Sequence, residues 1–514
     1  MVSITVSTRP ARRRWVWIGL GVLTIVSFLP AAPQGPFDAR DGARIPGVHL
    51  EMPLTAVLLE PLAAPVHVLA GAPDFRRAGI ATLVWVGLGA AGVSLARDRR
   101  RNRWKPRGLL RAAEGGLGAV GFLVAWLGFG VIVRLPGWRL VCDDPTWAVA
   151  DLQTHTYGSR DGLVSAPANL ATHAGHGYDV VAVTEHKHPD GAFAALRASR
   201  SRAGSAPDVI PGVEVRSPLG PYLLGIGLRP GVGLPKRNGR RDPTFERRFL
   251  SAVHQNHRGA VIALSYRLSP ADVDRLAALG VDAFEIVNLG HPALGPEVRD
   301  ALLRVAGTQG IPLVASSDWH GWGGVFRTWT LVRCPGGPPP EKRSEAERAL
   351  DLLRHHQRDA FVPAVAGVLG RPGWARVVTA PFFETVRYLL ELSPVRVLAW
   401  WAWGGALSSL LTFLARRRAR PGRCLLGLAL WVFAIGLGYR GVQWVAEAGA
   451  SPFSTKVGLE MIGLALACAA AGAASTRGGL RAPRKTRETF PAARAGRPAP
   501  DLLAPVAEDA RASG

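Results

Sequence analysis

The sequence predicts an α/β domain built on parallel strands and carried between two groups of transmembrane helices. Apolar runs long enough to cross a bilayer occupy both ends of the 514-residue chain. Between residues 147 and 334, short apolar strands alternate with helical stretches, which is typical of parallel strands joined by crossover helices. Polar side chains that can bind metal follow several of these strands, so we expect the chemistry to lie in the middle domain.

Six apolar runs have the length, about 17 to 25 residues, that a helix needs to span a membrane. They cover residues 15–32, 80–96 and 116–133 in an N-terminal membrane region (1–140), and residues 395–415, 424–444 and 457–474 in a C-terminal one (395–475). The first run could instead be a cleaved signal peptide, but it is long for one, which favours a retained anchor. Residues 52–72 are interrupted by Glu60, Pro61, Pro65 and His67, so we expect a re-entrant or surface helix there.

Basic residues fix the expected threading through the membrane. The net charge is +24, and four basic clusters lie beside the apolar runs, at residues 12–14, 97–107, 416–423 and 481–487. Basic residues beside spans stay in the cytoplasm, and one threading keeps all four clusters there. It predicts an integral, multi-pass membrane protein that contacts lipid and holds its central domain outside the cytoplasm. No basic surface interleaved with aromatic residues lies elsewhere, so nucleic-acid binding is not expected.

The central domain (141–340) contains eight strand-like runs, at residues 148–153, 178–185, 208–215, 221–228, 259–266, 281–288, 311–318 and 327–333. Helical stretches, such as 167–176 and 272–279, lie between several of them. Residues 341–394 indicate a helical connector with a charged helix and a later amphipathic stretch. The tail, residues 476–514, is rich in Pro, Ala, Arg and Gly and is predicted to be disordered.

Carboxylates and imidazoles gather at the carboxyl ends of the predicted strands, where the reactive side chains of such folds collect. Zn, Mn and Fe ions are held by donors of these kinds. A single histidine at a strand end is more often an ordinary hydrogen-bonded residue, but a joint pattern of this kind indicates a metal site. The candidate ligands are His155, Asp161, His186, Glu214, Asp318 and His320.

The segments DLQTH, SRDG and TEH within residues 151–186, and SDWH at 317–320, resemble motifs of the PHP (polymerase and histidinol phosphatase) superfamily. The usual family forms are D-x-H-x-H, S-D-G, T-D-H and S-D-x-H. Gln153 stands where the family has its first histidine, and Glu185 where it has aspartate. The resemblance covers the central domain only, and it implies a distorted (β/α)7 barrel that binds up to three metal ions.

By this resemblance, the first metal position contains His155, Glu214 and Asp318, with Gln153 in place of a second imidazole. A neutral amide oxygen is a weak ligand for a transition metal, so we expect this position to be weakened.

The second metal of the family needs two further histidines, and Tyr222 and Ser265 stand at those positions. Neither is a good ligand for a divalent metal, so we expect this ion to be absent. The third metal position is complete by resemblance, with Asp161, His186 and His320. Three protein ligands that leave positions for water are typical of a catalytic metal site.

These residues predict a metal-dependent hydrolase, a phosphoesterase, that binds one or two ions of Zn, Mn or Fe and acts on a phospho-substrate. His155, Glu214 and Asp318 would hold the weaker ion or serve as general acid and base groups. Arg267 and Arg327 are candidates for binding the substrate phosphate.

Because three expected ligands are replaced, a catalytically lapsed binding or structural module on a membrane platform is the alternative. The metal content of the protein would separate the two hypotheses. Transport by the spans is a third class, but no span contains an intramembrane charge pair to support it.

Cys142 and Cys334 flank the central domain, just before its first predicted strand and just after its last. An extracytoplasmic compartment permits disulfides, so we predict a Cys142–Cys334 bridge, with two free thiols as the alternative.

Overall fold

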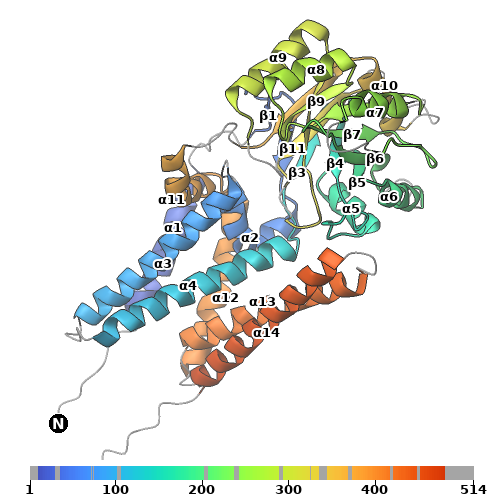
Figure 1. The fold of residues 1–514 in the computed structure, drawn as a ribbon. Coiled ribbons are helices and arrows are strands. Elements are labelled where there is room, and N and C mark those ends of the chain that lie inside the picture. Colours follow the sequence, from blue (N-terminus) through green and yellow to red (C-terminus); the bar gives the residue numbers. More distant parts are fainter. Residues whose placement is uncertain are drawn as a thin grey trace, which may run out of the picture.

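The structure, a computed structural model, describes residues 10–28, 35–70, 72, 74–100, 106–201, 206–236, 242–256, 258–288, 293–323, 326–334, 344–367, 373–416, 421–447 and 452–480. It has two parts, a bundle of long helices and an α/β domain that sits at one end of the bundle (Figure 1). The helices α3, α4, α13 and α14 run away from the domain.

The α/β domain is built on a ten-stranded sheet in the described part of the chain. In spatial order its strands are β1 (Phe37–Asp38), β12 (Phe361–Val365), β11 (Thr328–Arg333), β4 (Trp147–Thr154), β5 (Val180–His186), β6 (Asp208–Arg216), β7 (Tyr222–Ile226), β8 (Ala260–Ala263), β9 (Ala283–Asn288) and β10 (Leu313–Ser316). The eight strands predicted from the sequence correspond to β4 to β11, so this part of the prediction is confirmed.

Parallel pairing holds in two stretches, β4–β5–β6 and β8–β9–β10, and the remaining pairs are antiparallel. The expectation of parallel strands was therefore wrong at β7 and at β11, whose pairs are all antiparallel. The β6–β7 connection spans only residues 217–221, which is too short for a crossover helix and long enough for a hairpin. The result is a mixed α/β sheet, and a regular (β/α)7 barrel is not formed.

The sheet curls until its last strand approaches its first ones. The Thr330 hydroxyl of β11 donates to the Ala315 carbonyl of β10 at 2.6 Å, and Thr328 donates to the Ser316 carbonyl at 2.9 Å. Beyond β10, Trp319 forms a parallel bridge with Thr154 at the end of β4. These contacts bring the carboxyl ends of β4 and β10 together.

Helices cover the outside of the curled sheet, where crossover connections place them. They are α5 (Ala166–Gly175), α6 (Asp190–Arg200), α7 (Phe245–His254), α8 (Pro270–Leu279), α9 (Pro296–Gln309) and α10 (Glu345–Arg354). Helix α8 begins at a capping box formed by Ser269 and Asp272 and ends at Gly280, which has a left-handed backbone (φ 88°).

The domain extends beyond the predicted limits of 141–340. Strand β1 comes from the N-terminal region, and α10 and β12 come from the segment expected to be a helical connector. A small separate sheet pairs β2 (Val48–Glu51) with β3 (Arg139–Cys142) where the chain passes between bundle and domain. The rest of the connector forms α11 (Trp374–Leu390), the predicted amphipathic helix, which packs against α3.

Five helices among the described residues are long and apolar enough to cross a membrane. The candidate spans are Arg76–Arg97 of α3 (Phe75–Arg100), Gly108–Ile132 of α4 (Pro106–Ile132), Pro394–Leu414 of α12 (Pro394–Arg416), Arg423–Glu447 of α13 (Pro421–Glu447) and Pro452–Arg477 of α14 (Pro452–Leu480). Helices α13 and α14 cross closely at Gly441 and Gly458, where an added Cβ would meet the facing carbonyl oxygen at 2.7 to 2.8 Å.

The first predicted span does not meet this criterion. Helix α1 spans Pro10–Ser27, and among the residues whose side chains are described its apolar part, Trp17–Ser27, is shorter than a membrane span. Helix α1 lies beside α12, where the rings of Trp17 and Trp401 stack with centroids 5.4 Å apart. The segment expected to be a surface or re-entrant helix forms α2 (Leu54–Ala70), 17 residues long.

Two other sequence predictions need correction. Helix α14 continues to Leu480, so the tail predicted to be disordered from residue 476 begins as helix, and residues 481–514 lie outside the described part. Cys142 and Cys334 are free thiols in the structure, and the predicted disulfide is not formed. They pack in different clusters, Cys334 with Ala150 and Cys142 with Val149. Successive residues of β4 face opposite sides of the sheet, so the two thiols lie on opposite sides too.

Candidate metal centre

The curled sheet collects the predicted ligands at its carboxyl edge. His155 follows β4, His186 ends β5, Glu214 lies near the end of β6, and Asp318 and His320 follow β10. Two sets of ligand atoms each lie within 4.8 Å of one another, one from His155, His186 and His320 and the other from His155, Glu214 and Asp318. His155 is thus common to both sets. Residues that the sequence predicted as ligands therefore lie close together in the fold.

Asp161, His186 and His320 form the part of the site that reaches solvent, and we call them the open trio. Asp161 Oδ1 lies 3.2 Å from His186 Nε2 and 3.6 Å from His320 Nε2. The side chain of Asp161 is 45% exposed and that of His186 is 27% exposed, so solutes can reach them.

The open trio suits a divalent cation on the chemistry of its donors. Asp161 Oδ1 is buried and accepts no hydrogen bond from the residues that the structure describes. His320 Nδ1 lies 2.7 Å from the carbonyl of Asp318 and donates to it, which leaves the lone pair of Nε2 facing Asp161. A buried carboxylate oxygen without a donor and an imidazole held in the ligand tautomer are what a metal position requires.

Electrostatics in the open trio agree with this geometry. Burial alone raises the pKa of Asp161, but the imidazoles of His186 and His320 outweigh burial and hold the pKa well below its usual range. Burial, followed by the neighbouring His155, lowers the pKa of His320. These two directions favour an ionised carboxylate at Asp161 and a neutral imidazole at His320, the forms in which these groups bind metals.

Glu214 and Asp318 are joined by the amide of Gln153, and we call these two carboxylates the bridged pair. Gln153 Nε2 donates to Glu214 Oε2 at 2.9 Å and to Asp318 Oδ1 at 3.0 Å. Its Oε1 accepts from Asn288 Nδ2 at 3.2 Å and from Ser316 at 3.3 Å. Gln153 is 1% exposed, so its amide satisfies both carboxylates inside the domain without a cation.

A register shift in β4 lets Gln153 reach this position. The pairing of β4 with β5 is irregular between Asp151 and Thr154, and such irregularities re-aim side chains next to functional sites. The carboxylate of Asp151 instead pairs with His173, with Oδ2 lying 3.1 Å from Nε2. His173 is therefore a hydrogen-bonded core histidine, as expected for a histidine outside the motifs.

His155 is oriented by a chain of hydrogen bonds that the sequence did not reveal. Glu185 is buried and accepts from the hydroxyls of Ser159, at 2.5 Å, and Thr156. Because the Ser159 proton goes to Glu185, its oxygen accepts from His155 Nδ1 at 3.0 Å. His155 Nε2 then faces the bridged pair, 3.1 Å from Asp318 and 3.4 Å from Glu214.

The two ends of this chain of hydrogen bonds, His155 and Glu185, are held in different ways. Burial lowers the pKa of His155, but its contacts with Asp318 and Glu214 raise it well above its ordinary value. Gly158 and Gly191 enclose Glu185 so closely that an added Cβ would lie 2.9 and 2.4 Å from its carboxyl group. Glu185 is thus closely packed and holds Ser159 by a hydrogen bond.

The position of the second expected metal is filled by other interactions. Ser265 Oγ donates to Glu285 Oε2 at 2.7 Å, and Glu285 also accepts from Ser316 and from Asn288. Burial raises the pKa of Glu285 to about 7. The Tyr222 ring packs on Tyr266, with centroids 5.4 Å apart. These side chains offer a metal no imidazole at this position.

The two arginines predicted to bind phosphate lie in different surroundings. Arg267 is exposed and lies over the Tyr266 ring, 5.1 Å from its centroid. Arg327 is 9% exposed, and burial, followed by the nearby Arg387 of α11, lowers its pKa to about 10. The charges around Arg327 belong to α11 and α12, so the structure does not bring it to the open trio.

Two other exposed cations border the open trio, and sequence reasoning missed them. Arg160 precedes Asp161, and Lys187 follows His186 with a left-handed backbone (φ 70°). Each is next in the chain to one of the ligands. Their adjacency to two ligands was visible in the sequence.

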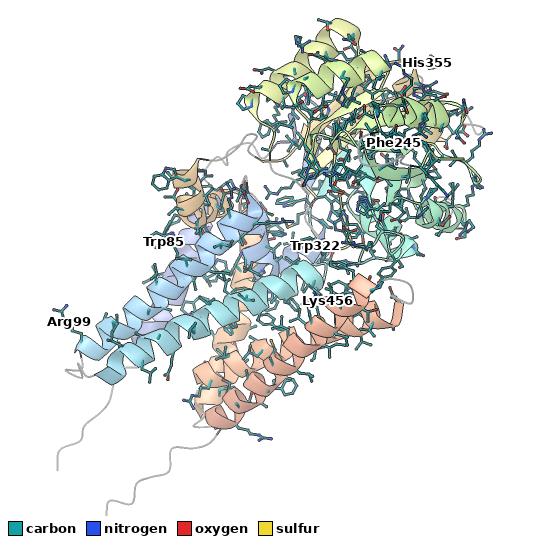
Figure 2. All side chains as sticks on the ribbon, in the orientation of Figure 1. Trp85, Arg99, Phe245, Trp322, His355 and Lys456 are labelled. Carbon is teal, nitrogen blue, oxygen red and sulfur yellow. The ribbon has the colours of Figure 1, made fainter. Side chains whose placement is uncertain are left out.

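The loops that hold Asp161 and His320 rest directly on the helix bundle. Arg134, just after α4, donates from Nε to the Gly321 carbonyl at 2.9 Å and from a terminal nitrogen to the Leu163 carbonyl at 2.9 Å. Trp322 follows His320 in its loop and lies between the domain and the helix ends (Figure 2). The site therefore faces the bundle.

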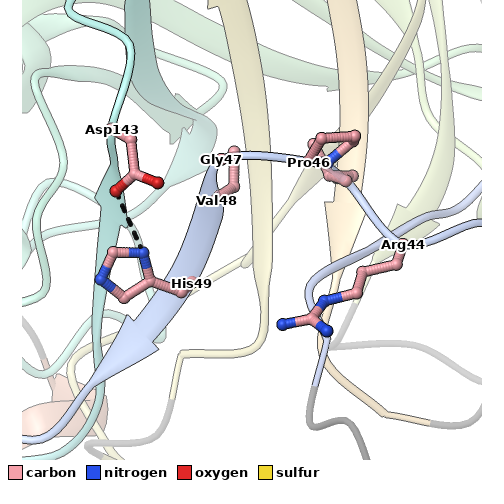
Figure 3. Close-up of a pocket in the computed structure, with 7 residues that line it drawn as sticks. Arg44, Pro46, Gly47, Val48, His49 and Asp143 are labelled. Atoms are coloured by element: carbon pink, nitrogen blue, oxygen red, sulfur yellow. Dashed lines mark ion pairs between the residues drawn. The ribbon is translucent and has the colours of Figure 1, made fainter.

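A separate cavity of about 430 Å³ lies at the β2–β3 sheet and is lined by Arg44, Pro46, Gly47, Val48, His49 and Asp143, among others (Figure 3). His49 Nδ1 lies 3.4 Å from Asp143 Oδ1. None of the ligands described above lines this cavity, so it is separate from the metal centre.

No family model matches the chain, and no curated protein matches it. Three solved structures are similar to its α/β part. A protein described as a metal-dependent phosphoesterase, from Bifidobacterium adolescentis, is 18% identical over 40% of this chain and 96% of its own (TM-score 0.29). An amidohydrolase from Chromobacterium violaceum, with bound sulfate and no metal, is 13% identical over 44% and 99% (TM-score 0.27). PsfC from Pseudomonas syringae is 15% identical over 47% and 98% (TM-score 0.30). Likeness at these TM-scores carries no argument about function.

Proposed function

We propose that this protein is a membrane-anchored, metal-dependent hydrolase that acts on phosphate esters. The observation that carries the proposal is the open trio, in which the buried Asp161 Oδ1 accepts no hydrogen bond in the described structure and faces two imidazoles. A carboxylate oxygen left without a donor costs about 1 to 3 kcal/mol or more, so its retention indicates a ligand.

The residues of the chain divide the chemistry between them. Asp161, His186 and His320 would hold the cation, with His155 in contact with both sets of ligands. A divalent ion bound there would lower the pKa of water and offset the negative charge that develops on the phosphate. Glu214 would accept a proton at the carboxyl edge of the sheet, where its Oε1 lies 3.6 Å from His186 Nδ1.

The substrate phosphate would bind among the cations at the mouth. Arg160 and Lys187 border the open trio, and Arg267 is exposed beyond the end of β8. Phosphate oxygens accept strong, charge-assisted hydrogen bonds from such side chains. Arg327 is not proposed for this role, because its electrostatic neighbours lie on α11 and α12.

We propose that the α/β domain lies outside the cytoplasm. Arg99 of the 97–107 basic cluster lies at the end of the bundle opposite the domain (Figure 2), which supports this threading. Phosphatase reporters inserted after Arg240 should be active, and reporters inserted between Arg416 and Arg423 should be inactive. The reverse pattern would place the domain in the cytoplasm.

A catalytically lapsed binding module is the second candidate, and one observation favours it. The amide of Gln153 satisfies both carboxylates of the bridged pair, so that half of the site is stable without a cation. In that case the open trio would hold an ion or an anionic ligand without turning it over.

Hydrolysis by the full-length protein in detergent decides between the two candidates. The protein is stripped with a chelator, reloaded separately with Mn, Zn and Fe, and tested on a soluble phosphomonoester and a soluble phosphodiester. We expect hydrolysis that depends on metal and is lost in His186→Ala. The control is His188→Ala, which removes an exposed histidine two positions away. Tight metal binding without turnover of either ester would favour the binding module.

A further inference from the structure

The loop that contains Asp161 is bonded to the ends of two candidate spans. Ser454, in the first turn of α14, donates to the Gly162 carbonyl at 3.0 Å. Trp444, in the last turns of α13, donates from Nε1 to the Leu163 carbonyl at 2.8 Å and is 1% exposed. Leu163 packs in the same apolar cluster as residues of α4, α13 and α14. The loop is thus part of the bundle as well as part of the site.

A second loop, which contains His320, is held in the same way. Gly323 donates from its amide to the Val131 carbonyl near the end of α4 at 2.8 Å. Arg134 binds this loop and the Asp161 loop at once and lies over the Trp319 ring, 5.4 Å from its centroid. Both loops of the open trio therefore touch residues at the ends of candidate spans.

These contacts fix the depth of the site relative to a bilayer. The candidate spans include Gly108–Ile132 and Arg423–Glu447, and Tyr157, four residues before Asp161, donates to Glu447 at 2.9 Å. The headgroup layer on each side of the hydrocarbon core is roughly 5 to 8 Å thick. With the candidate spans in a bilayer, a site one loop away from their ends would lie near the lipid headgroups, within reach of a lipid phosphate.

The surface beside the mouth has the side chains expected at this level. Trp322 is 49% exposed, and exposed tryptophan side chains are enriched where membrane meets water. Arg440 lies inside the candidate span of α13, and its charge acts on Arg134 and on Tyr157. A basic residue inside a span is costly and is usually retained for a function. Here it lies about two helical turns before Glu447, the residue that accepts from Tyr157.

We propose that the substrate is a phosphate ester carried by a lipid of the membrane surface that the domain faces, with Arg440 and Trp322 holding the headgroup region and the open trio facing the phosphate. This inference rests on the proposed hydrolase function. In the reaction, water gives its oxygen to phosphorus, the bond from phosphorus to the leaving alcohol oxygen breaks, and the water proton passes to that oxygen.

Substrate presentation is the first test. The full-length, metal-loaded protein is assayed with phosphatidic acid and phosphatidylglycerol in mixed micelles, and with glycerol 3-phosphate and a soluble phosphodiester. We expect kcat/KM for a lipid to be at least about tenfold higher than for the soluble ester of the same type, because confinement to the surface raises the effective concentration at the mouth.

Lipid binding is the second test, and it does not depend on turnover. Binding of a fluorescent phosphatidic acid is measured with chelator-treated, full-length protein. We expect Arg440→Gln to weaken binding by about tenfold, Arg440→Lys to restore most of it, and Trp322→Ala to weaken it by several-fold, roughly. The matched controls are Arg477→Gln, at the opposite end of α14, and Trp374→Ala on α11, and both should bind as the wild type.

The outcomes separate this inference from the function on which it rests. Turnover of the soluble esters with no preference for lipid would overturn the lipid inference and leave the hydrolase intact. Turnover of neither the soluble esters nor the lipids would overturn the proposed hydrolase function. Equal weakening by Arg440→Gln and Arg477→Gln would show a general charge effect and would overturn the headgroup contact.

Discussion

The two halves of the metal centre differ in how their carboxylates are satisfied. In the bridged pair, Glu214 and Asp318 each accept a hydrogen bond from the amide of Gln153. In the open trio, Asp161 faces two imidazoles, and its buried oxygen accepts no hydrogen bond within the described structure. One half is therefore complete with protein groups alone, whereas Asp161 Oδ1 in the other half has, among the described residues, only its ion-pair contacts with His186 and His320.

This difference shows how buried carboxylates can be satisfied without a metal ion. The amide of Gln153 supplies one donor to Glu214 and one to Asp318. Buried carboxylates without a donor would be costly, so Gln153 stabilises this half of the site without an ion. The open trio has no such amide, and we expect the tight ion there.

The largest expected effect is loss of the metal from the open trio. His186→Ala removes an imidazole ligand, and even the partners that orient ligands are worth about 10 to 100-fold in affinity. We expect metal affinity to fall by at least about 100-fold, measured by titration of chelator-stripped protein. His188→Ala is the matched control and should bind as the wild type. Similar losses in both variants would contradict the assignment of His186.

Removing the amide of Gln153 tests the other half of the site, the bridged pair. Gln153→Leu deletes both donors to Glu214 and Asp318, and hydrogen bonds to charged groups are worth about 1.5 to 3 kcal/mol each. We expect the free energy of unfolding to fall by roughly 3 to 5 kcal/mol, measured by denaturant unfolding without metal. Gln153→His, which restores an imidazole, should bind one more ion than the wild type. Unchanged stability in Gln153→Leu would show that the amide is not the partner of the bridged pair.

The free energy of unfolding should also depend on pH, through the buried Glu285. Burial raises the pKa of Glu285 to about 7 from a model-compound value of 4.5. The protonated form is therefore favoured in the folded state, so this contribution is fully present below pH 4.5 and is lost as the pH rises through 7. It amounts to at most about 3 kcal/mol. Glu285→Gln, which stays neutral, should remove it, and an equal slope in both proteins between pH 4.5 and 7 would contradict the account.

The smallest effect concerns the position of the absent second metal. Ser265→Ala removes one hydrogen bond to Glu285, which still accepts from Ser316 and Asn288. We expect about 1 kcal/mol less stability and no change in metal content, by denaturant unfolding and elemental analysis. A loss of bound metal in this variant would show that Ser265 lies at an occupied position.

The sequence predicted much of the fold because strand patterns and apolar runs are local signals. All eight strands of the predicted central domain are present, and five of six predicted spans are confirmed as helices long and apolar enough to cross a membrane. Strand β12 was missed because a short apolar run after a charged helix gave no sign of its partners, β11 on one side and β1, from the other end of the chain, on the other. Long-range pairing of this kind leaves no local pattern.

The candidate ligands were predictable for a similar reason, since each lies near the end of a strand that the sequence indicates or in the loop that follows it. What connects them was not. The hydrogen bonds of Gln153 depend on a register shift in β4, and those of Ser159 depend on where Glu185 packs. The contact of Arg134 with two distant loops depends on how the bundle meets the domain. The predicted pair Cys142 and Cys334 was wrong because nearness in topology did not fix the side of the sheet.

The number of metal ions bound by the full-length protein tests the central claim most directly. After loading and removal of excess metal, elemental analysis should find one tightly held ion and at most two in all, and the tight ion should disappear in His186→Ala. Three ions would contradict the account, because Gln153, Tyr222 and Ser265 would then have to lie at occupied positions. No ion under metal-replete conditions would contradict the hydrolase function and leave the binding module in its place.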